Sequence, residues 1–147
     1  MRESSEARRI VVGVDDSDHA LRALEWAVGE ATLRRIELCV LTCWTLPGAL
    51  ETAPVSAAAW DEQPFVAAAQ ATVQRSVAKA GLPSRSDLRW TREVHAGTAG
   101  AILVRESEHA ELVVVGSRGR GGFAGLLLGS VSQQVAAHAH CPVVIVR

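Results

Sequence analysis

Five short hydrophobic runs alternate along the chain with segments in which apolar residues recur every three or four positions. The runs cover residues 10–14, 36–44, 88–94, 112–115 and 143–146. The first, fourth and fifth consist almost entirely of valine and isoleucine, which is typical of strands covered by helices on both faces. The third run alternates between apolar and polar residues, so we expect it to be half exposed.

The segments between the runs have the spacing of amphipathic helices. Ser17 is a suitable N-cap for the first helix, in which Leu21, Leu24, Val28 and Ala31 are expected to face inward. Further helices are expected from about Asp61 to Gly81, from Thr98 to a residue before Glu111, and from Gly129 to a residue before Cys141. The alternation predicts an α/β, Rossmann-like fold: a single domain over residues 1–147 with an open, parallel five-stranded sheet in the order 3-2-1-4-5 and helices on both faces.

Two segments do not fit this alternation. Residues 1–8 are charged and are expected to form a disordered tail. Residues 45–60 contain Pro47, Gly48 and Pro54 and are longer than an ordinary connection. The sequence leaves open whether this second segment is a lid or simply a mobile loop.

The composition excludes several classes of protein. The chain of 147 residues carries 15 basic and 16 acidic residues and has 4% aromatic residues with no tyrosine. A net charge of −1 provides no general attraction for nucleic acids or membranes, and stacking side chains for bases are scarce. Three cysteines do not make a disulfide framework, and no run reaches the length of a membrane helix. We therefore expect a cytoplasmic protein that binds neither nucleic acid nor membrane.

Glycine is concentrated directly after the fourth apolar run. Six of the twelve glycines fall between Gly116 and Gly129, with Arg118 and Arg120 among them. Successive main-chain N–H groups without Cβ atoms form an anion-binding surface, and the following helix adds the positive end of its dipole. The alternative is a surface loop that needs glycines only for its turns. In the expected strand order this loop and Asp15 flank the point where ligands bind in open parallel sheets, which favours a phosphate site.

Other motifs of nucleotide or metal chemistry are incomplete. The sequence lacks the G-x4-G-K-[ST] motif of P-loop NTPases. The match of 119–124 to a dinucleotide fingerprint follows the fourth strand instead of the first and is accidental. His138, His140 and Cys141 lie at a helix end, point in different directions and lack a fourth ligand, so we expect no metal site there.

The spacing Gly116-x2-Gly119-x9-Gly129-Ser130 resembles the G-x2-G-x9-G-[ST] signature of the ATP-binding branch of the universal stress protein family. The segment 10–17, Gly97 before a helix and the closing segment 141–147 also resemble that family. The resemblance covers nearly the whole chain in the expected order.

The resemblance implies a set of ATP-binding residues. Asp15 would face the ribose, the phosphates and, indirectly, a nucleotide-bound Mg²⁺. The other residues implied are Gly13 and Val14 along the nucleotide, Cys43 with its main chain at adenine, Gly116, Arg118 and Gly119 around ribose and phosphates, and Gly129, Ser130, Val131 and Ser132 on the phosphates. Asp16 departs from the family, which usually has glycine there, and is expected to add negative charge near the phosphates.

The resemblance also implies a homodimer joined antiparallel through the apolar edge strand Val143–Val146. The expected function is that of an ATP-binding regulator or sensor of stress with at most slow ATP hydrolysis and no dedicated catalytic residues. The alternative is a nucleotide-free interaction module of the same fold, against which the complete glycine signature counts. An ATP pyrophosphatase is disfavoured because Asp15, Asp16 and Ser17 do not form the loop expected of that class.

Overall fold

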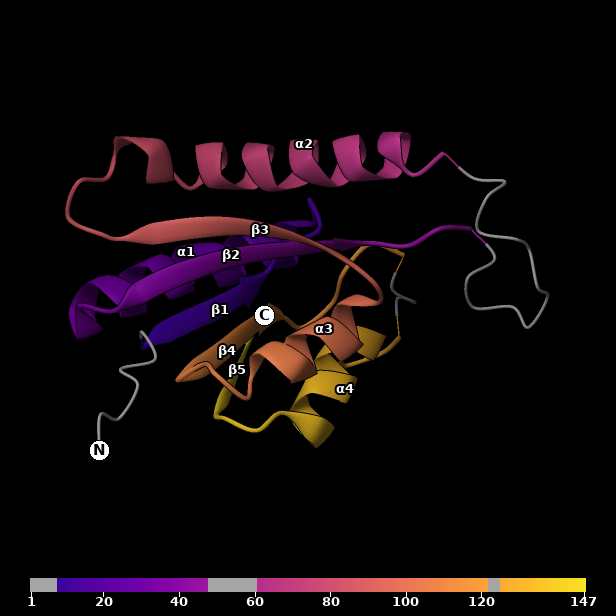
Figure 1. Cartoon of the computed structure of the whole chain (residues 1–147). Helices are drawn as coiled ribbons and strands as arrows, with labels where there is room; N and C mark the ends of the chain where they lie inside the picture. Colours follow the sequence, from indigo (N-terminus) through magenta and orange to yellow (C-terminus); the bar gives the residue numbers. More distant parts are fainter. Residues whose placement is uncertain (1–7, 48–60, 122–124) are drawn as a thin grey trace, which may run out of the picture.

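Five strands form one parallel sheet in the order β3-β2-β1-β4-β5 (Figure 1). The structure is a computed structural model that describes residues 8–47, 61–121 and 125–147. The strands are β1 (Arg9–Gly13), β2 (Glu37–Trp44), β3 (Trp90–Ala96), β4 (Leu112–Gly116) and β5 (Val143–Val146). The predicted fold class and strand order are confirmed.

Helices cover both faces of the sheet, as predicted. They are α1 (Asp18–Arg34), α2 (Gln63–Lys79), α3 (Ala99–Glu106) and α4 (Ser130–His138), with a short 3-10 helix, η2 (Leu82–Ser84), after α2. In Figure 1, α2 lies across β2 and β3, while α3 and α4 lie side by side against the opposite face. The helices thus bury the sheet between two layers.

Helix α1 illustrates how the sequence positions an element. Its N-cap Ser17 accepts a hydrogen bond from the Ala20 N–H at 3.1 Å, and its C-cap Arg35 adopts a left-handed conformation. Leu21, expected to face inward, is only half-buried. The buried positions are mostly small residues, which allow the helix to lie close to the sheet: Ala20, Ala23, Leu24, Ala27, Val28 and Ala31.

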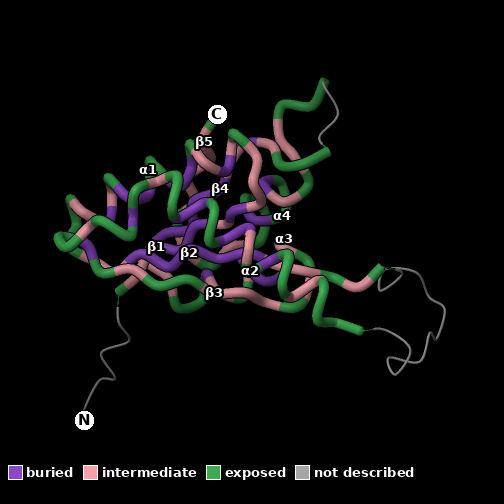
Figure 2. The backbone as a smooth tube through the Cα atoms, turned by 90° about the horizontal axis from the view of Figure 1, so that it is seen from above, coloured by how far each residue is buried: buried purple, intermediate pink, exposed green. Residues whose placement is uncertain are grey.

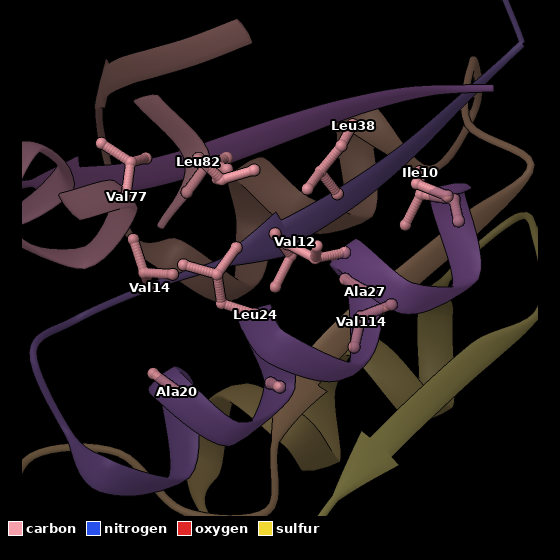
Figure 3. Packing of buried hydrophobic residues seen from close by; sticks show 14 of the residues in the cluster. Ile10, Val12, Val14, Ala20, Leu24, Ala27, Leu38, Val77, Leu82 and Val114 are labelled. Atoms are coloured by element: carbon pink, nitrogen blue, oxygen red, sulfur yellow. The ribbon is translucent and has the colours of Figure 1, made fainter. Parts of the chain in front are cut away.

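Two hydrophobic clusters fill the space on either side of the sheet. Along β1, Ile10, Val12 and Val14 face α1 and α2 (Figure 3), whereas Val11 faces α3 and α4. Figure 2 shows that β1, β2 and β4 run through the buried centre, with exposed residues on the outer sides of the helices. The near-continuous apolar runs therefore reflect burial on both faces.

Strand β3 begins two residues later than predicted and extends to Ala96. Leu88, assigned from the sequence to this strand, is 7% exposed and belongs to the core from the preceding turn. The strand itself is an edge strand with half-buried and exposed residues, as its alternation indicates. Its additional residues are held by pairing with the end of β2, where Trp44 lies opposite Ala96.

The N-terminal tail and the long connection after β2 lie largely outside the described residues. The expected tail lies outside the described residues except for Arg8, which forms an ion pair with Glu111. The expected lid or loop over 45–60 also lies outside the described residues from residue 48 onward. All three cysteines are free, as predicted. No helix within the described ranges is long and apolar enough to cross a membrane.

Candidate functional site

A cavity of about 350 Å³ lies at the carboxyl edge of the sheet, where the strand order reverses between β1 and β4. Its walls are the ends of β1, β2 and β4, the glycine-rich loop after β4, and the first turns of three helices. All eleven residues assigned to a nucleotide line this one cavity: Gly13, Val14, Asp15, Cys43, Gly116, Arg118, Gly119, Gly129, Ser130, Val131 and Ser132. The fold therefore brings together all the positions that the resemblance assigns to the nucleotide.

Asp15 follows β1 and crosses from one wall of the cavity to the other. Its Oδ1 accepts hydrogen bonds from the Ser17 N–H at 3.0 Å and the Ser17 hydroxyl at 2.5 Å. Its Oδ2 accepts a hydrogen bond from the Arg120 main-chain N–H at 3.0 Å. The carboxylate thus connects the turn before α1 to the glycine-rich loop.

Two signature glycines are required by contacts within the protein. A Cβ on Gly119 would lie 2.5 Å from Asp15 Oδ2. A Cβ on Gly116 would lie 2.8 Å from the main-chain carbonyl carbon of His19 in α1. No such contact restricts Gly129, whose Cβ would meet its nearest neighbour, Arg118 Cα, at 3.4 Å. Gly116 and Gly119 therefore serve close packing around the loop.

Hydrogen bonds to Ser117 fix the two ends of the loop. The Ser117 N–H donates to the Val146 carbonyl at 2.7 Å, and the Ser117 carbonyl accepts from the Gly129 N–H at 2.7 Å. The Ser132 hydroxyl, which is buried, donates to the Ser117 carbonyl at 3.0 Å and the Gly129 carbonyl at 2.9 Å. The resemblance assigns Ser132 to phosphates, but in this structure its hydroxyl is used to join the loop to α4.

Arg118 lies between these fixed points and lines the cavity. Its Nε is buried and has no hydrogen-bond partner in the described part of the chain. A buried donor without a partner costs free energy comparable to a lost hydrogen bond. Arg118 therefore carries an unsatisfied buried donor in a residue that lines the cavity.

The opposite end of the cavity is formed by β2, α3 and neighbouring apolar residues. Cys43 is half-buried there, and burial raises the pKa of its thiol to about 11. Thr42 donates its hydroxyl to the Val14 carbonyl at 2.8 Å, which joins β2 to the turn after β1. Leu41 and Leu103 complete an apolar wall. This end is suited to a flat apolar group more than to a charged one.

Asp16 differs from its expected role. Its backbone has a φ of 68°, a conformation that favours glycine, and its side chain does not line the cavity. Asp16 Oδ2 accepts hydrogen bonds from Arg75 Nη2 at 2.5 Å and from Thr72 Oγ1 at 3.2 Å, both in α2. The hydrogen bond from Arg75 lowers the pKa of the Asp16 carboxyl. Asp16 therefore pairs with α2 through Oδ2, whereas its buried Oδ1 has no hydrogen-bond partner in the described part of the chain.

Sequence reasoning missed part of the lining. The additional residues are Ala20, Leu41, Thr42, Ala99, Leu103, Val115 and Leu126, whereas Arg120 and Gly121, which also line the cavity, belong to the loop that the sequence indicated. Several occupy the carboxyl end of a strand or the first turn of a helix, which is where ligands meet a parallel sheet. Strand and helix boundaries alone were sufficient to identify those positions.

Metal ligands are not gathered in the part of the chain that the structure describes. Within the described residues, no group of three or more His, Cys, Asp or Glu is arranged to hold a metal ion. His138, at the end of α4, and His140 lie outside the cavity lining. Among the described residues that line the cavity, Asp15 is the one with an acidic side chain.

Comparison with known proteins identifies the family. The Universal stress protein family matches residues 6–147. A universal stress protein of Mycolicibacterium smegmatis is 37% identical over 141 residues, which cover 94% of this chain and 45% of that protein. The chain therefore spans about half the length of the curated relatives it matches.

Solved structures show the same fold. The universal stress protein UspA from Lactobacillus plantarum is similar with a TM-score of 0.73 and 23% identity, covering 96% of this chain and 98% of that one. A universal stress protein in complex with cAMP is similar with a TM-score of 0.66 and 26% identity, covering 97% and 99%. The family match over residues 6–147 and the shared fold agree: the chain belongs to the universal stress protein family.

Proposed function

We propose that the cavity binds an adenine nucleotide, with ATP as the ligand that its features support best. The observation that carries the proposal is the convergence of the eleven assigned residues on one cavity at the switch point of the sheet. A cavity of about 350 Å³ has the size of a small-molecule site.

The loop side of the cavity supports a phosphate chain. Arg118 and Arg120 supply positive charge, and Arg118 Nε has no partner among the described residues. The first turns of α1, α3 and α4 all border the cavity, so main-chain N–H groups and helix dipoles favour an anion there. Mg²⁺ prefers carboxylate and phosphate oxygens, and it would be held by the phosphates of the nucleotide, with Asp15 facing it only indirectly.

The β2 side supports the base. Leu41, Leu103 and Val115 present apolar surface, and the end of β2 at Cys43 supplies main-chain groups. A similar universal stress protein, at 26% identity, was solved in complex with cAMP, which supports an adenine nucleotide as the ligand.

We further propose that the protein acts as a cytoplasmic regulator or sensor in a stress response and does not turn over a substrate. Among the described lining residues, Asp15 is the one with a carboxylate side chain. Both of its carboxylate oxygens already accept hydrogen bonds, so Asp15 is poorly placed to act as a general base. ATP hydrolysis would then be slow at most.

We also propose that the protein forms a homodimer through the edge strand β5. Strand β5 is at the edge of the sheet, and all four of its apolar residues are half-buried. An apolar edge strand favours pairing with a second copy. Size-exclusion chromatography with light scattering tests this, and a mass of 15.6 kDa, the monomer, would contradict it.

Nucleotide binding is tested directly on the purified full chain. The protein is denatured and the supernatant assayed for adenine nucleotide, and nucleotide-free protein is then titrated with ATP by calorimetry, with and without Mg²⁺. Gly119→Glu places bulk and negative charge beside Asp15 and should abolish binding. Gly125→Glu is the matched control, because a Cβ there meets nothing within 4 Å.

Two results would count against the proposal. Unchanged affinity in Gly119→Glu would show that the site is elsewhere. Absence of both co-purified nucleotide and ATP binding in the wild-type protein would favour the alternative, a nucleotide-free interaction module of the same fold.

A further inference from the structure

The Asp15 carboxylate is the centre of a hydrogen-bond bridge within the protein. It accepts two hydrogen bonds from Ser17 and one from the Arg120 N–H, which is 105 positions away in the sequence. We call these three hydrogen bonds the Asp15 bridge. The Asp15 carboxylate therefore connects two walls of the cavity in the absence of a ligand, which contact with a ligand alone would not require.

Gly119 fits around the same carboxylate. A Cβ at this position would lie 2.5 Å from Asp15 Oδ2, closer than side chains approach one another in proteins. A methyl group would therefore force the carboxylate to turn away from the Arg120 N–H. The second glycine of the signature and Asp15 form one packing unit.

Arg118 is held between two fixed neighbours. On one side, Ser117 is bound to Val146 and Gly129 by hydrogen bonds of 2.7 Å each. On the other side, Arg120 is bound to Asp15. The donor that lacks a partner, Arg118 Nε, thus belongs to a segment whose two ends are both anchored before a ligand arrives.

We propose that Asp15 is a positioning residue that shapes the loop over residues 117–121 in the ligand-free protein, and that Gly119 is glycine to admit the Asp15 carboxylate. Asp15 then contributes to nucleotide affinity mainly through the loop, and only secondarily through a cation. The statement about affinity rests on the proposed function; the statement about the loop does not.

The loop is tested without any nucleotide. Hydrogen–deuterium exchange of the Arg120 amide is measured by NMR on the ligand-free full chain. Asp15→Ala should accelerate exchange at least about tenfold, because hydrogen bonds to charged acceptors are among the stronger ones. Asp18→Ala is the matched control, since it removes an equal charge from an exposed position in the first turn of α1. Exchange at the wild-type rate in Asp15→Ala would overturn the proposal.

A double-mutant cycle separates packing against Asp15 from packing against a ligand. Gly119→Ala should accelerate Arg120 exchange in the wild-type background, whereas Gly125→Ala should not. In the Asp15→Ala background, Gly119→Ala should add less than about twofold, because the carboxylate that it displaces is gone. Equal acceleration by Gly119→Ala in both backgrounds would overturn the proposal. If Asp15→Ala fails to fold, the comparison of Gly119→Ala with Gly125→Ala still decides it.

The affinity is tested by titrating Asp15→Ala with ATP. A loop defect should weaken binding by a similar factor with and without Mg²⁺, whereas loss confined to Mg²⁺ conditions would make Asp15 a cation ligand and contradict the inference. If the wild-type protein binds no ATP, the proposed function is wrong. The exchange measurements on the ligand-free protein still test whether the Asp15 bridge shapes the loop.

Discussion

The contact between Gly116 and His19 gives the sharpest prediction for stability. The perturbation is Gly116→Ala, which adds one methyl group where β4 meets the first turn of α1. The new Cβ would lie 2.8 Å from the His19 carbonyl carbon and 2.9 Å from its oxygen. Ordinary contacts begin near 3.4 Å, so the strand and helix must separate by about half an ångström.

The cost follows from the atoms involved. The three nearest atoms are the carbonyl carbon, the carbonyl oxygen and the Cβ of His19, and none of them can move aside as the far end of a flexible side chain does. Overpacking of this kind costs about 1–3 kcal/mol of the free energy of unfolding. For a domain of this size the Tm falls by roughly 3 °C per kcal/mol, so we expect a decrease of about 3–10 °C.

The same chemical change has the opposite sign in the middle of α1. Gly29 is exposed and a Cβ on it would meet nothing within 4 Å. Gly29→Ala should raise the free energy of unfolding by about 0.5–1 kcal/mol, because alanine loses less backbone entropy in a helix.

Urea and thermal denaturation of both variants, without nucleotide and at one protein concentration, provide the measurement. The concentration is fixed because ligands and self-association change the apparent stability. Gly116→Ala as stable as the wild type, or both variants shifted in the same direction, would refute the packing argument.

Three further predictions concern other parts of the fold. Leu24→Ala should lower the free energy of unfolding by about 2–5 kcal/mol, since Leu24 is fully buried between α1 and the sheet; a urea midpoint within error of the wild type would contradict this. Because Arg75 lowers the pKa of Asp16, the stability that this pair contributes is fully present above the ordinary aspartate value and is lost as pH falls through the lowered one. Arg75→Gln should therefore flatten the urea stability profile from about pH 5 downward, and an unchanged slope there would count against the ion pair. Burial raises the pKa of the Cys43 thiol to about 11, so at about pH 7 it should be alkylated much more slowly than free cysteine, and more slowly still when ATP is present. The rate of alkylation is followed by mass spectrometry. Rapid labelling that ATP does not change would contradict the position of Cys43 in the cavity wall.

Local sequence patterns predict much of the fold. The valine-rich runs at β1 and β4 predict buried parallel strands because both faces of each strand are covered by helices. The run at β5 also predicts a parallel strand, but its residues are only half-buried because it lies at the edge of the sheet. Ser17 predicts the start of α1 because its hydroxyl satisfies a free N–H of the first turn. The glycine spacing, combined with strand order, predicts the position of the cavity.

Contacts between distant segments were not predictable in this way. The sequence shows Asp16 next to Asp15, but nothing local indicates that it turns to Arg75 in α2. The requirement for glycine at position 116 arises from the backbone of His19, which only the packing of α1 on β4 brings close. Leu88 has the polarity of a strand residue but reaches the core from a turn. Each of these depends on tertiary geometry and not on the period of a pattern.

The reversal of strand order has a consequence for how the chain acquires its site. One wall of the cavity comes from the region up to Cys43, and the facing loop and helix come from residues 115–132. During synthesis the first wall therefore emerges long before the second. If the cavity binds a nucleotide as proposed, recognition requires translation of the sheet as far as α4, so a bound nucleotide would mark a molecule in which both walls have already come together.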